Sequence, residues 1–256
     1  MPDSRCQIDG NWELETGNWN LNLRRVRARG LQWELGTFPG PVHARWMPLR
    51  TRVKICGLTR AEDVDAAVEA GADAVGFVFV AGTPRVVSVD RARALRARVP
   101  PFVTVVGLFV NADPAEVRET VSAVRLDVVQ LHGEESPEVA AACGQWARVV
   151  KAFRMKGAET LELFPAYAGV AQAYLVDAFV AGAHGGTGAR FDWDLAIRAK
   201  GFGQPVILAG GLKPENAAEA VQRVGAYALD VSSGVESAPG LKDPERIKRF
   251  MAAVRG

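Results

Sequence analysis

The chain has 256 residues, 48% of them hydrophobic and 23% charged, which is enough for a sizeable hydrophobic core. Its 31 basic and 29 acidic residues give a formal net charge of +2. This small excess of basic residues does not favour a nucleic acid or an anionic membrane as a partner. A small anionic substrate is compatible with it. No apolar run approaches the roughly 20 residues of a membrane helix, and the N-terminus lacks the apolar segment of a secretory signal.

The three cysteines, Cys6, Cys56 and Cys143, are an odd number, lie far apart and form no C-x-x-C pair. This pattern argues against a disulfide framework and against a structural zinc site. We therefore expect a cytoplasmic protein that binds no metal.

Residues 1–51 differ from the remainder of the chain. They show no sustained period of 2 or 3.6, and they contain four of the six tryptophans. We expect an N-terminal extension that is disordered, forms a small appended element, or is absent from the natural product. Met47 is a possible start of translation, and the intact mass of the protein made from its native gene tests that hypothesis.

From Arg52 onward, short runs of Val, Ile, Leu and Phe alternate with segments of helical period, which is typical of repeated βα units and a parallel sheet. The near-continuous apolar character of these runs favours strands that are covered on both faces. The predicted strands are Val53–Gly57, Ala74–Phe79, Val103–Val110, Val128–Leu131, Val149–Phe153, Ala173–Val176, Val206–Ala209 and Ala228–Val231.

Helix signals lie between these strands. One helix is predicted over Ala61–Ala70 after a Thr59 cap, and another over Val89–Arg98 after a Ser88 cap. Proline suits the first helical position, because its missing N–H costs nothing there. Four further helices are predicted to begin at Asp113-Pro114, Ser136-Pro137, Lys213-Pro214 and Asp243-Pro244, and two weaker ones at Ala158–Ala166 and after Phe191.

Eight strands with about eight helices fit either a closed barrel or an open doubly wound sheet. The similar units and short connections favour the barrel, so we predict an α/β fold with one (β/α)8 TIM barrel over residues 52–256. In such a barrel the active site lies at the C-terminal ends of the strands.

Two strand ends carry groups that can move protons. Cys56 ends the first strand and Asp177 ends the sixth. Cys56 could be a buried structural cysteine or a thiolate base, and Asp177 could be a loop carboxylate or a general acid or base. The two strands lie three steps apart around a barrel, which puts inward side chains roughly 7–9 Å apart and leaves room for a small sugar.

Other strand ends carry candidate substrate contacts. Arg85 can grip a carboxylate bidentately or lie in solvent, and His132 can orient the substrate, tune Cys56 or be structural. The glycine-rich loop around Gly186 is either a surface loop or a loop that faces a phosphate. The ends of strands seven and eight expose small residues, as a barrel phosphate site requires, and Asp230 could also brace its loop. The phosphate candidates are Gly210, Gly211, Asp230, Ser232, Ser233 and Gly234.

Nine segments together resemble the phosphoribosylanthranilate isomerase family, in order and spacing, over roughly four-fifths of the chain. These segments are VKICGLT, ADAVGFVF, TPR, VGLFVN, VQLHGEE, LVDA, GGTGARFDW, LAGGL-P-N and ALDVSSGVE-PG-KD. The first 51 residues match nothing in the family pattern.

The resemblance implies an isomerase of tryptophan biosynthesis, which performs an Amadori rearrangement of N-(5-phosphoribosyl)anthranilate. It implies Asp177 as the general acid that opens the sugar ring and Cys56 as the general base at sugar C2. Arg85 would hold the anthranilate carboxylate, and the loops at Gly211 and Ser233-Gly234 would hold the phosphate. No cofactor is implied, and a monomer and a homodimer are both compatible with such a barrel.

Alternatives remain at this stage. The related isomerase of histidine biosynthesis uses carboxylates at both catalytic positions, so Cys56 argues against it. Indole-glycerol-phosphate synthase has a lysine-centred site that is not apparent here, since Lys54 would lie on the same face as Cys56 but deeper in the barrel. A non-catalytic barrel that binds a phosphorylated metabolite would bind tightly without turnover.

Overall fold

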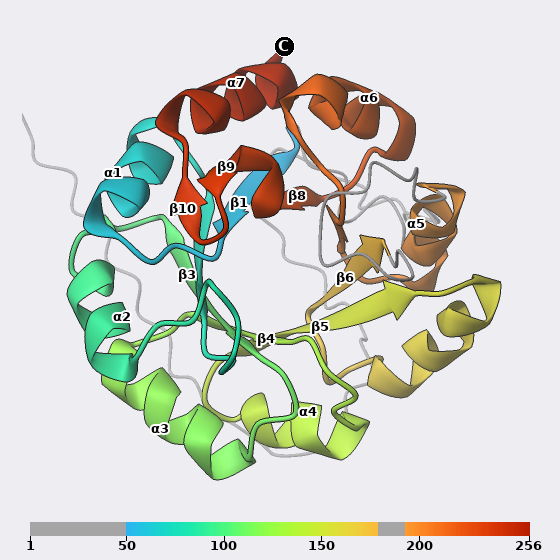
Figure 1. The fold of residues 1–256 in the computed structure, drawn as a ribbon. Helices are drawn as coiled ribbons and strands as arrows, with labels where there is room; N and C mark the ends of the chain where they lie inside the picture. Colours follow the sequence, from blue (N-terminus) through green and yellow to red (C-terminus); the bar gives the residue numbers. More distant parts are fainter. Residues whose placement is uncertain (1–49, 179–192) are drawn as a thin grey trace, which may run out of the picture. The chain divides into compact units, whose positions relative to one another are not determined.

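The computed structural model describes residues 50–178 and 193–256, so residues 1–49 and the loop that contains Gly186 lie outside the description. Eight parallel strands close into one barrel in chain order (Figure 1). The prediction of a (β/α)8 barrel is therefore confirmed. Its strands are β1 (Arg52–Cys56), β2 (Ala74–Val78), β3 (Thr104–Phe109), β4 (Val128–Leu131), β5 (Arg148–Met155), β6 (Ala173–Ala178), β7 (Val206–Ala209) and β8 (Ala228–Val231).

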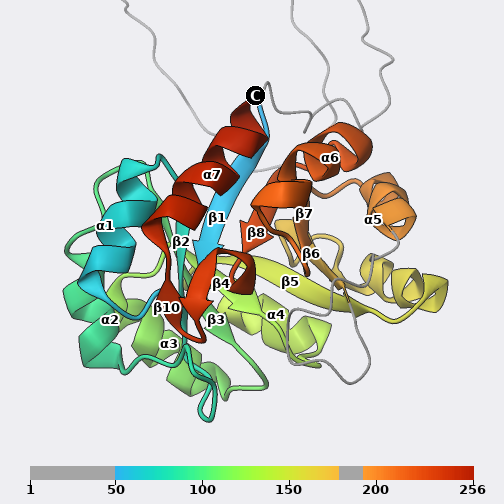
Figure 2. The ribbon, with the colours of Figure 1, turned by 45° about the horizontal axis from the view of Figure 1, so that its top comes forward.

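Helices surround the barrel, as Figures 1 and 2 show. Proline occupies the first turn of four of them, α3, α4, α6 and α7, at the positions that the sequence predicted. The helical elements are α1 (Ala61–Glu69), α2 (Val89–Arg96), α3 (Pro114–Val124), α4 (Pro137–Cys143), η2 (Ala158–Tyr167), α5 (Trp193–Ala199), η3 (Lys200–Phe202), α6 (Pro214–Val224) and α7 (Pro244–Arg255).

Two helix predictions need correction. The segment after β5 is a 3₁₀ helix, η2, with Pro165 inside it, because proline lacks the N–H that an α-helix needs there. The predicted Thr59 cap of α1 is wrong, since the capping position is Arg60 and makes no side-chain cap. The Thr59 hydroxyl instead donates to the carbonyl of Gly240 at 2.8 Å.

The barrel has two apolar layers. Outward strand residues such as Ile55 and Phe77 are fully buried against the helices in one continuous core. Inside the barrel, Ala152, Leu175 and Ala209 form a second, smaller cluster. Because side chains alternate along a strand, residues two positions farther on from these inner residues face the mouth of the barrel.

A short hairpin follows β8, and the sequence did not predict it. It consists of β9 (Glu236–Ala238) and β10 (Leu241–Lys242), which pair antiparallel after the 3₁₀ turn η4 (Ser233–Val235). A side chain at Gly240 would come within 2.3 Å of the Pro84 carbonyl, so only glycine lets the hairpin approach the β2–α2 loop this closely.

A buried ion pair ties three strands together outside the barrel. Lys151 on β5 donates to Glu135 at 2.9 Å, and both side chains are almost fully buried. The two oxygens of Glu135 also accept from the backbone N–H groups of Asn111 and Gly133. Every charge in this cluster is therefore satisfied, which suits a structural role.

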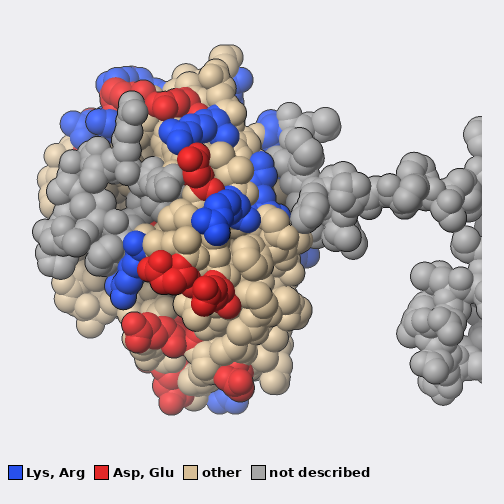
Figure 3. Space-filling view, turned by 90° about the vertical axis from the view of Figure 1, so that its right-hand side faces the viewer, with Lys and Arg blue, Asp and Glu red and all other residues tan. Residues whose placement is uncertain are grey.

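The surface carries charges of both signs. On the face in Figure 3, Lys and Arg side chains are interspersed with Asp and Glu among other residues. Within residues 50–178 and 193–256, no helix is long and apolar enough to cross a membrane.

Candidate active site

Cys56 is the last residue of β1, and its side chain faces the barrel mouth with 5% of its surface exposed. The chain turns away directly after it, at Gly57, whose φ of +77° favours glycine. The N–H groups of Gly57 and Leu58 both donate to the carbonyl of Gly76. Burial raises the pKa of the Cys56 thiol, and the nearby Lys54 ammonium offsets part of that rise. The buried site therefore favours the neutral thiol.

Asp230 lies beneath Cys56 rather than among the loop N–H groups. Asp230 and Lys54 are register partners on β8 and β1, and the ammonium donates to Asp230 Oδ2 at 2.8 Å. The Asp230 residue is only 7% exposed. Asp230 therefore holds the ammonium of Lys54 on the neighbouring strand, and neither of the two roles that the sequence left open for it, phosphate contact or brace of its own loop, is seen in this contact.

Asp177 sits at the mouth on β6, two residues after the inward-facing Leu175. The side chain of His132 contacts it, with 3.2 Å between His132 Nε2 and Asp177 Oδ2. On its other side, the Gln130 amide nitrogen lies 2.9 Å from His132 Nδ1. His132 thus bridges Gln130 and Asp177 through its two ring nitrogens, and the tautomer of the ring sets which atoms donate. His132 therefore holds the carboxylate of Asp177 rather than tuning Cys56.

The closed strand order places β1 and β6 three steps apart, through β8 and β7. Cys56 and Asp177 thus approach the mouth from separated sides of the ring, as the sequence predicted. The roughly 7–9 Å between their side chains stays a prediction of barrel geometry.

Arg85 is fixed beside Cys56 by two neighbours. Its Nε and one terminal nitrogen donate to the two oxygens of Glu236, both at 2.7 Å. Its stem packs over Gly57, where an added Cβ would lie 2.6 Å from Arg85 Cδ. Lys242 donates to the same Glu236 carboxylate at 2.8 Å. Burial acts to raise the pKa of Glu236, but Arg85 and Lys242 outweigh it and hold the pKa below its usual value.

Two cations therefore share one carboxylate in this cluster, which leaves a net positive charge next to Cys56. Such a cluster attracts a carboxylate or another anion. Sequence reasoning singled out Arg85 but missed Glu236 and Lys242. Both lie in the segment ALDVSSGVE-PG-KD, but no periodicity or strand-end rule marks them as partners of Arg85.

The loops after β7 and β8 present backbone groups at the mouth. Gly210 and Gly211 both have positive φ, and a Cβ added at Gly211 would meet no atom within 4 Å. The first N–H groups that donate hydrogen bonds within η4 are those of Val235 and Glu236. The N–H groups of Ser233 and Gly234 come before them and therefore have no acceptor within this turn. N–H groups at such a position can bind an anion.

Close packing joins the two loops. A Cβ at Gly234 would lie 1.9 Å from the Leu212 carbonyl oxygen, so the β8 loop lies directly against the β7 loop. Ser232, which the sequence also marked for substrate binding, instead donates its hydroxyl to the carbonyl of Cys56 at 3.0 Å. Its hydroxyl thereby couples the loop to the end of β1.

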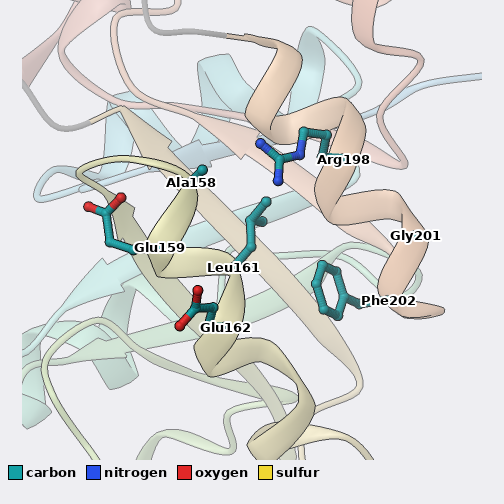
Figure 4. Close-up of a pocket in the computed structure, with 7 residues that line it drawn as sticks. All are labelled: Ala158, Glu159, Leu161, Glu162, Arg198, Gly201 and Phe202. Atoms are coloured by element: carbon teal, nitrogen blue, oxygen red, sulfur yellow. The ribbon is translucent and has the colours of Figure 1, made fainter.

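A separate surface groove lies away from these groups. It runs between η2 and the end of α5 with η3, encloses about 700 Å³ and is lined by Ala158, Glu159, Leu161, Glu162, Arg198, Gly201 and Phe202 (Figure 4). It contains no thiol or imidazole, and it lies on helices outside the barrel. The described residues also hold no group of three or more His, Cys, Asp or Glu side chains placed to bind a metal.

A family model described as N-(5'phosphoribosyl)anthranilate (PRA) isomerase matches residues 53–253. An N-(5'-phosphoribosyl)anthranilate isomerase from Citrifermentans bemidjiense is 54% identical over 206 residues, which cover 80% of this chain and 97% of that protein.

Solved structures of phosphoribosylanthranilate isomerases also match this chain. Monomers generated from the dimeric phosphoribosylanthranilate isomerase of Thermotoga maritima match with a TM-score of 0.72 and 38% identity, covering 80% of this chain and 99% of theirs. A phosphoribosyl anthranilate isomerase in complex with reduced 1-(o-carboxyphenylamino)-1-deoxyribulose 5-phosphate matches with a TM-score of 0.72 and 39% identity, over the same shares.

Proposed function

The chain belongs to the family of N-(5'-phosphoribosyl)anthranilate isomerases, and from that premise we propose that Asp177 and Cys56 carry the two proton transfers of the reaction. That reaction is an Amadori rearrangement in tryptophan biosynthesis, and it converts the aminoaldose N-(5-phosphoribosyl)anthranilate into 1-(2-carboxyphenylamino)-1-deoxyribulose 5-phosphate. The family assigns the chain to this step rather than to the histidine pathway or to a binding role without turnover.

Asp177 is the general acid of the first step. Its protonated carboxyl group gives a proton to the furanose ring oxygen, the bond from C1 to that oxygen breaks, and the nitrogen lone pair forms a Schiff base. His132 contacts Oδ2 and thereby fixes the carboxyl group, which leaves Oδ1 for the sugar.

Cys56 is the general base of the second step. Its thiolate takes the proton from sugar C2, the electrons of that C–H bond form a double bond between C1 and C2, and the π electrons of the C=N bond return to the positively charged nitrogen to give an enolamine. The enolamine then tautomerises to the ketone. Burial raises the pKa of the Cys56 thiol, and the positive charge on the nitrogen after ring opening stabilises the thiolate that acts as the base.

The observation that carries this proposal is the placement of a thiol and a carboxyl group on strands three apart at one barrel mouth. A positive cluster at Arg85 and an N–H-lined loop at Gly234 lie at the same mouth, and they match the carboxylate and the phosphate of the substrate. The loss of anthranilate-type fluorescence during turnover tests the proposal.

Replacing Arg85 with Ala is expected to raise KM about tenfold or more with a smaller effect on kcat, because a charge-assisted contact to the substrate carboxylate is lost. Steady-state kinetics on the fluorescent substrate measure this. Arg91→Ala is the control and should leave KM unchanged. It removes an exposed arginine of α2 that donates a hydrogen bond to the Thr59 carbonyl. Unchanged KM and kcat in Arg85→Ala would mean that Arg85 does not hold the substrate carboxylate.

Gly234→Ala is expected to raise KM at least about tenfold, because the added Cβ pushes the β8 loop away from the Leu212 carbonyl and misplaces the N–H groups for the phosphate. The inhibition constant for inorganic phosphate should weaken in parallel. Gly201→Ala is the matched control, since a Cβ there meets no atom within 4 Å. Phosphate inhibition equal to that of the wild type in Gly234→Ala would contradict this site.

We also propose the domain limits and setting of this enzyme. Residues 52–256 form the isomerase domain, in line with the family match over residues 53–253, and residues 1–51 lie outside it. The odd number and wide spacing of the three cysteines argue against a disulfide framework and thereby support a cytoplasmic location. The chain acts as a monomer or homodimer on its phosphorylated substrate.

A further inference from the structure

Cys56 has a buried lysine beneath it that the proposed steps do not use. Lys54 and Cys56 are two residues apart on β1, so both side chains face the interior of the barrel. Lys54 is almost fully buried, and its ammonium donates to Asp230 Oδ2 at 2.8 Å. Burial alone would lower the pKa of Lys54, but Asp230 and Cys56 raise it above its usual value, so the ammonium stays charged.

Gly76 on the neighbouring strand shows how closely the thiol and the ammonium approach each other. It is the register partner of Cys56, and an added Cβ there would lie 3.0 Å from Cys56 Sγ and 3.1 Å from Lys54 Nζ. Cys56 Sγ and Lys54 Nζ thus both lie next to the position that a side chain at Gly76 would occupy. A larger residue there would push against both atoms.

Four charged groups bear on the thiol from the elements around it. Lys54 on β1 and Lys242 on β10 favour the thiolate, whereas Asp230 on β8 opposes it. Arg85 in the β2–α2 loop is a further cation close enough to interact with Cys56. Lys54 is the strongest of the influences that favour the thiolate.

The Lys54–Asp230 pair differs from the structural pair Lys151–Glu135. In the structural pair both carboxylate oxygens accept hydrogen bonds. In the pair under Cys56, Asp230 Oδ1 is buried and has no partner among the described residues. A buried oxygen without a partner costs stability, so selection for stability alone does not explain this arrangement.

We propose that Lys54 is a positioning residue whose buried ammonium keeps the Cys56 thiol able to lose its proton, and that Asp230 holds Lys54 while limiting that effect. The inference rests on the proposed function, because it explains how a buried thiol can serve as the base. It makes Lys54 and Asp230 act on Cys56 in opposite directions, so the single variants of the two residues should shift the thiol in opposite senses.

The test is the pH dependence of Cys56 alkylation by iodoacetamide, quantified on the Cys56 peptide by mass spectrometry. In Lys54→Met the apparent pKa of Cys56 should rise by about 1 to 3 pH units, and in Asp230→Asn it should fall. Lys151→Met is the matched control, since it removes an equally buried lysine outside the barrel and should leave the profile unchanged. A profile of Lys54→Met equal to that of the wild type overturns the inference.

Two further measurements keep the result interpretable. If Lys54→Met does not fold by circular dichroism, the double variant Lys54→Met/Asp230→Asn removes both charges and should still show a rise, while no rise overturns the inference. The pH profile of kcat/KM then separates the two proposals. An alkylation profile that shifts without any shift of the acidic limb of kcat/KM supports the action of Lys54 on the thiol but contradicts Cys56 as the base.

Discussion

Cys56→Ala lowers kcat at least a hundredfold, because general-base catalysis typically contributes about 10²–10⁴ to the rate and no other described thiol reaches the mouth. The substitution removes one buried sulfur atom and no charge, so the barrel should stay folded. Steady-state turnover and the thermal unfolding midpoint, measured on the same preparation, separate a loss of chemistry from a loss of fold.

Cys143→Ala is the matched control for this prediction. Cys143 is a free, fully buried cysteine at the end of α4, outside the barrel mouth. Its replacement creates a small cavity but should leave kcat near that of the wild type. Near-normal kcat in Cys56→Ala would remove Cys56 from the role of base.

Asp177→Asn is also expected to lower kcat at least a hundredfold. The amide keeps the shape of the side chain and can still form a hydrogen bond with His132, but it cannot give a proton to the ring oxygen. KM should change much less than kcat, because the contacts to the carboxylate and the phosphate lie elsewhere. The two constants from one substrate titration test this pattern.

Asp127→Asn is the control for the carboxylate. Asp127 accepts a hydrogen bond from the N–H of Val105 and lies just before β4, at the opposite end of the barrel from the strand ends that carry the site. Its replacement should affect stability rather than turnover. Equal kcat values for Asp177→Asn and the wild type would mean that another group opens the ring.

Much of the fold could be predicted because its signals are local. The eight strands lie within two residues of their predicted limits, since near-continuous apolar runs mark strands buried on both faces. Asp-Pro, Ser-Pro and Lys-Pro pairs marked four helix starts. The β9–β10 hairpin escaped prediction because it is very short and depends on distant contacts, such as that between Thr59 and Gly240.

The sequence was enough to predict which strand ends carry the candidate site, but not which other residues contact the side chains there. The rule that barrel sites lie at the C-terminal strand ends selected Cys56, Asp177 and Arg85. It could not reveal that Glu236 fixes Arg85, because these residues are far apart in sequence and meet only through the hairpin. The sequence also gave no means to weigh burial against the Lys54 charge at Cys56, so the raised pKa of the thiol was not anticipated.

The most direct test is the decrease of anthranilate-type fluorescence when the purified protein meets freshly made N-(5-phosphoribosyl)anthranilate, run side by side with Cys56→Ala and Asp177→Asn. Rapid turnover by the wild type and at least a hundredfold slower turnover by each variant are expected. A wild-type protein that binds the substrate without turning it over, or variants that turn it over at the wild-type rate, would contradict the proposed function.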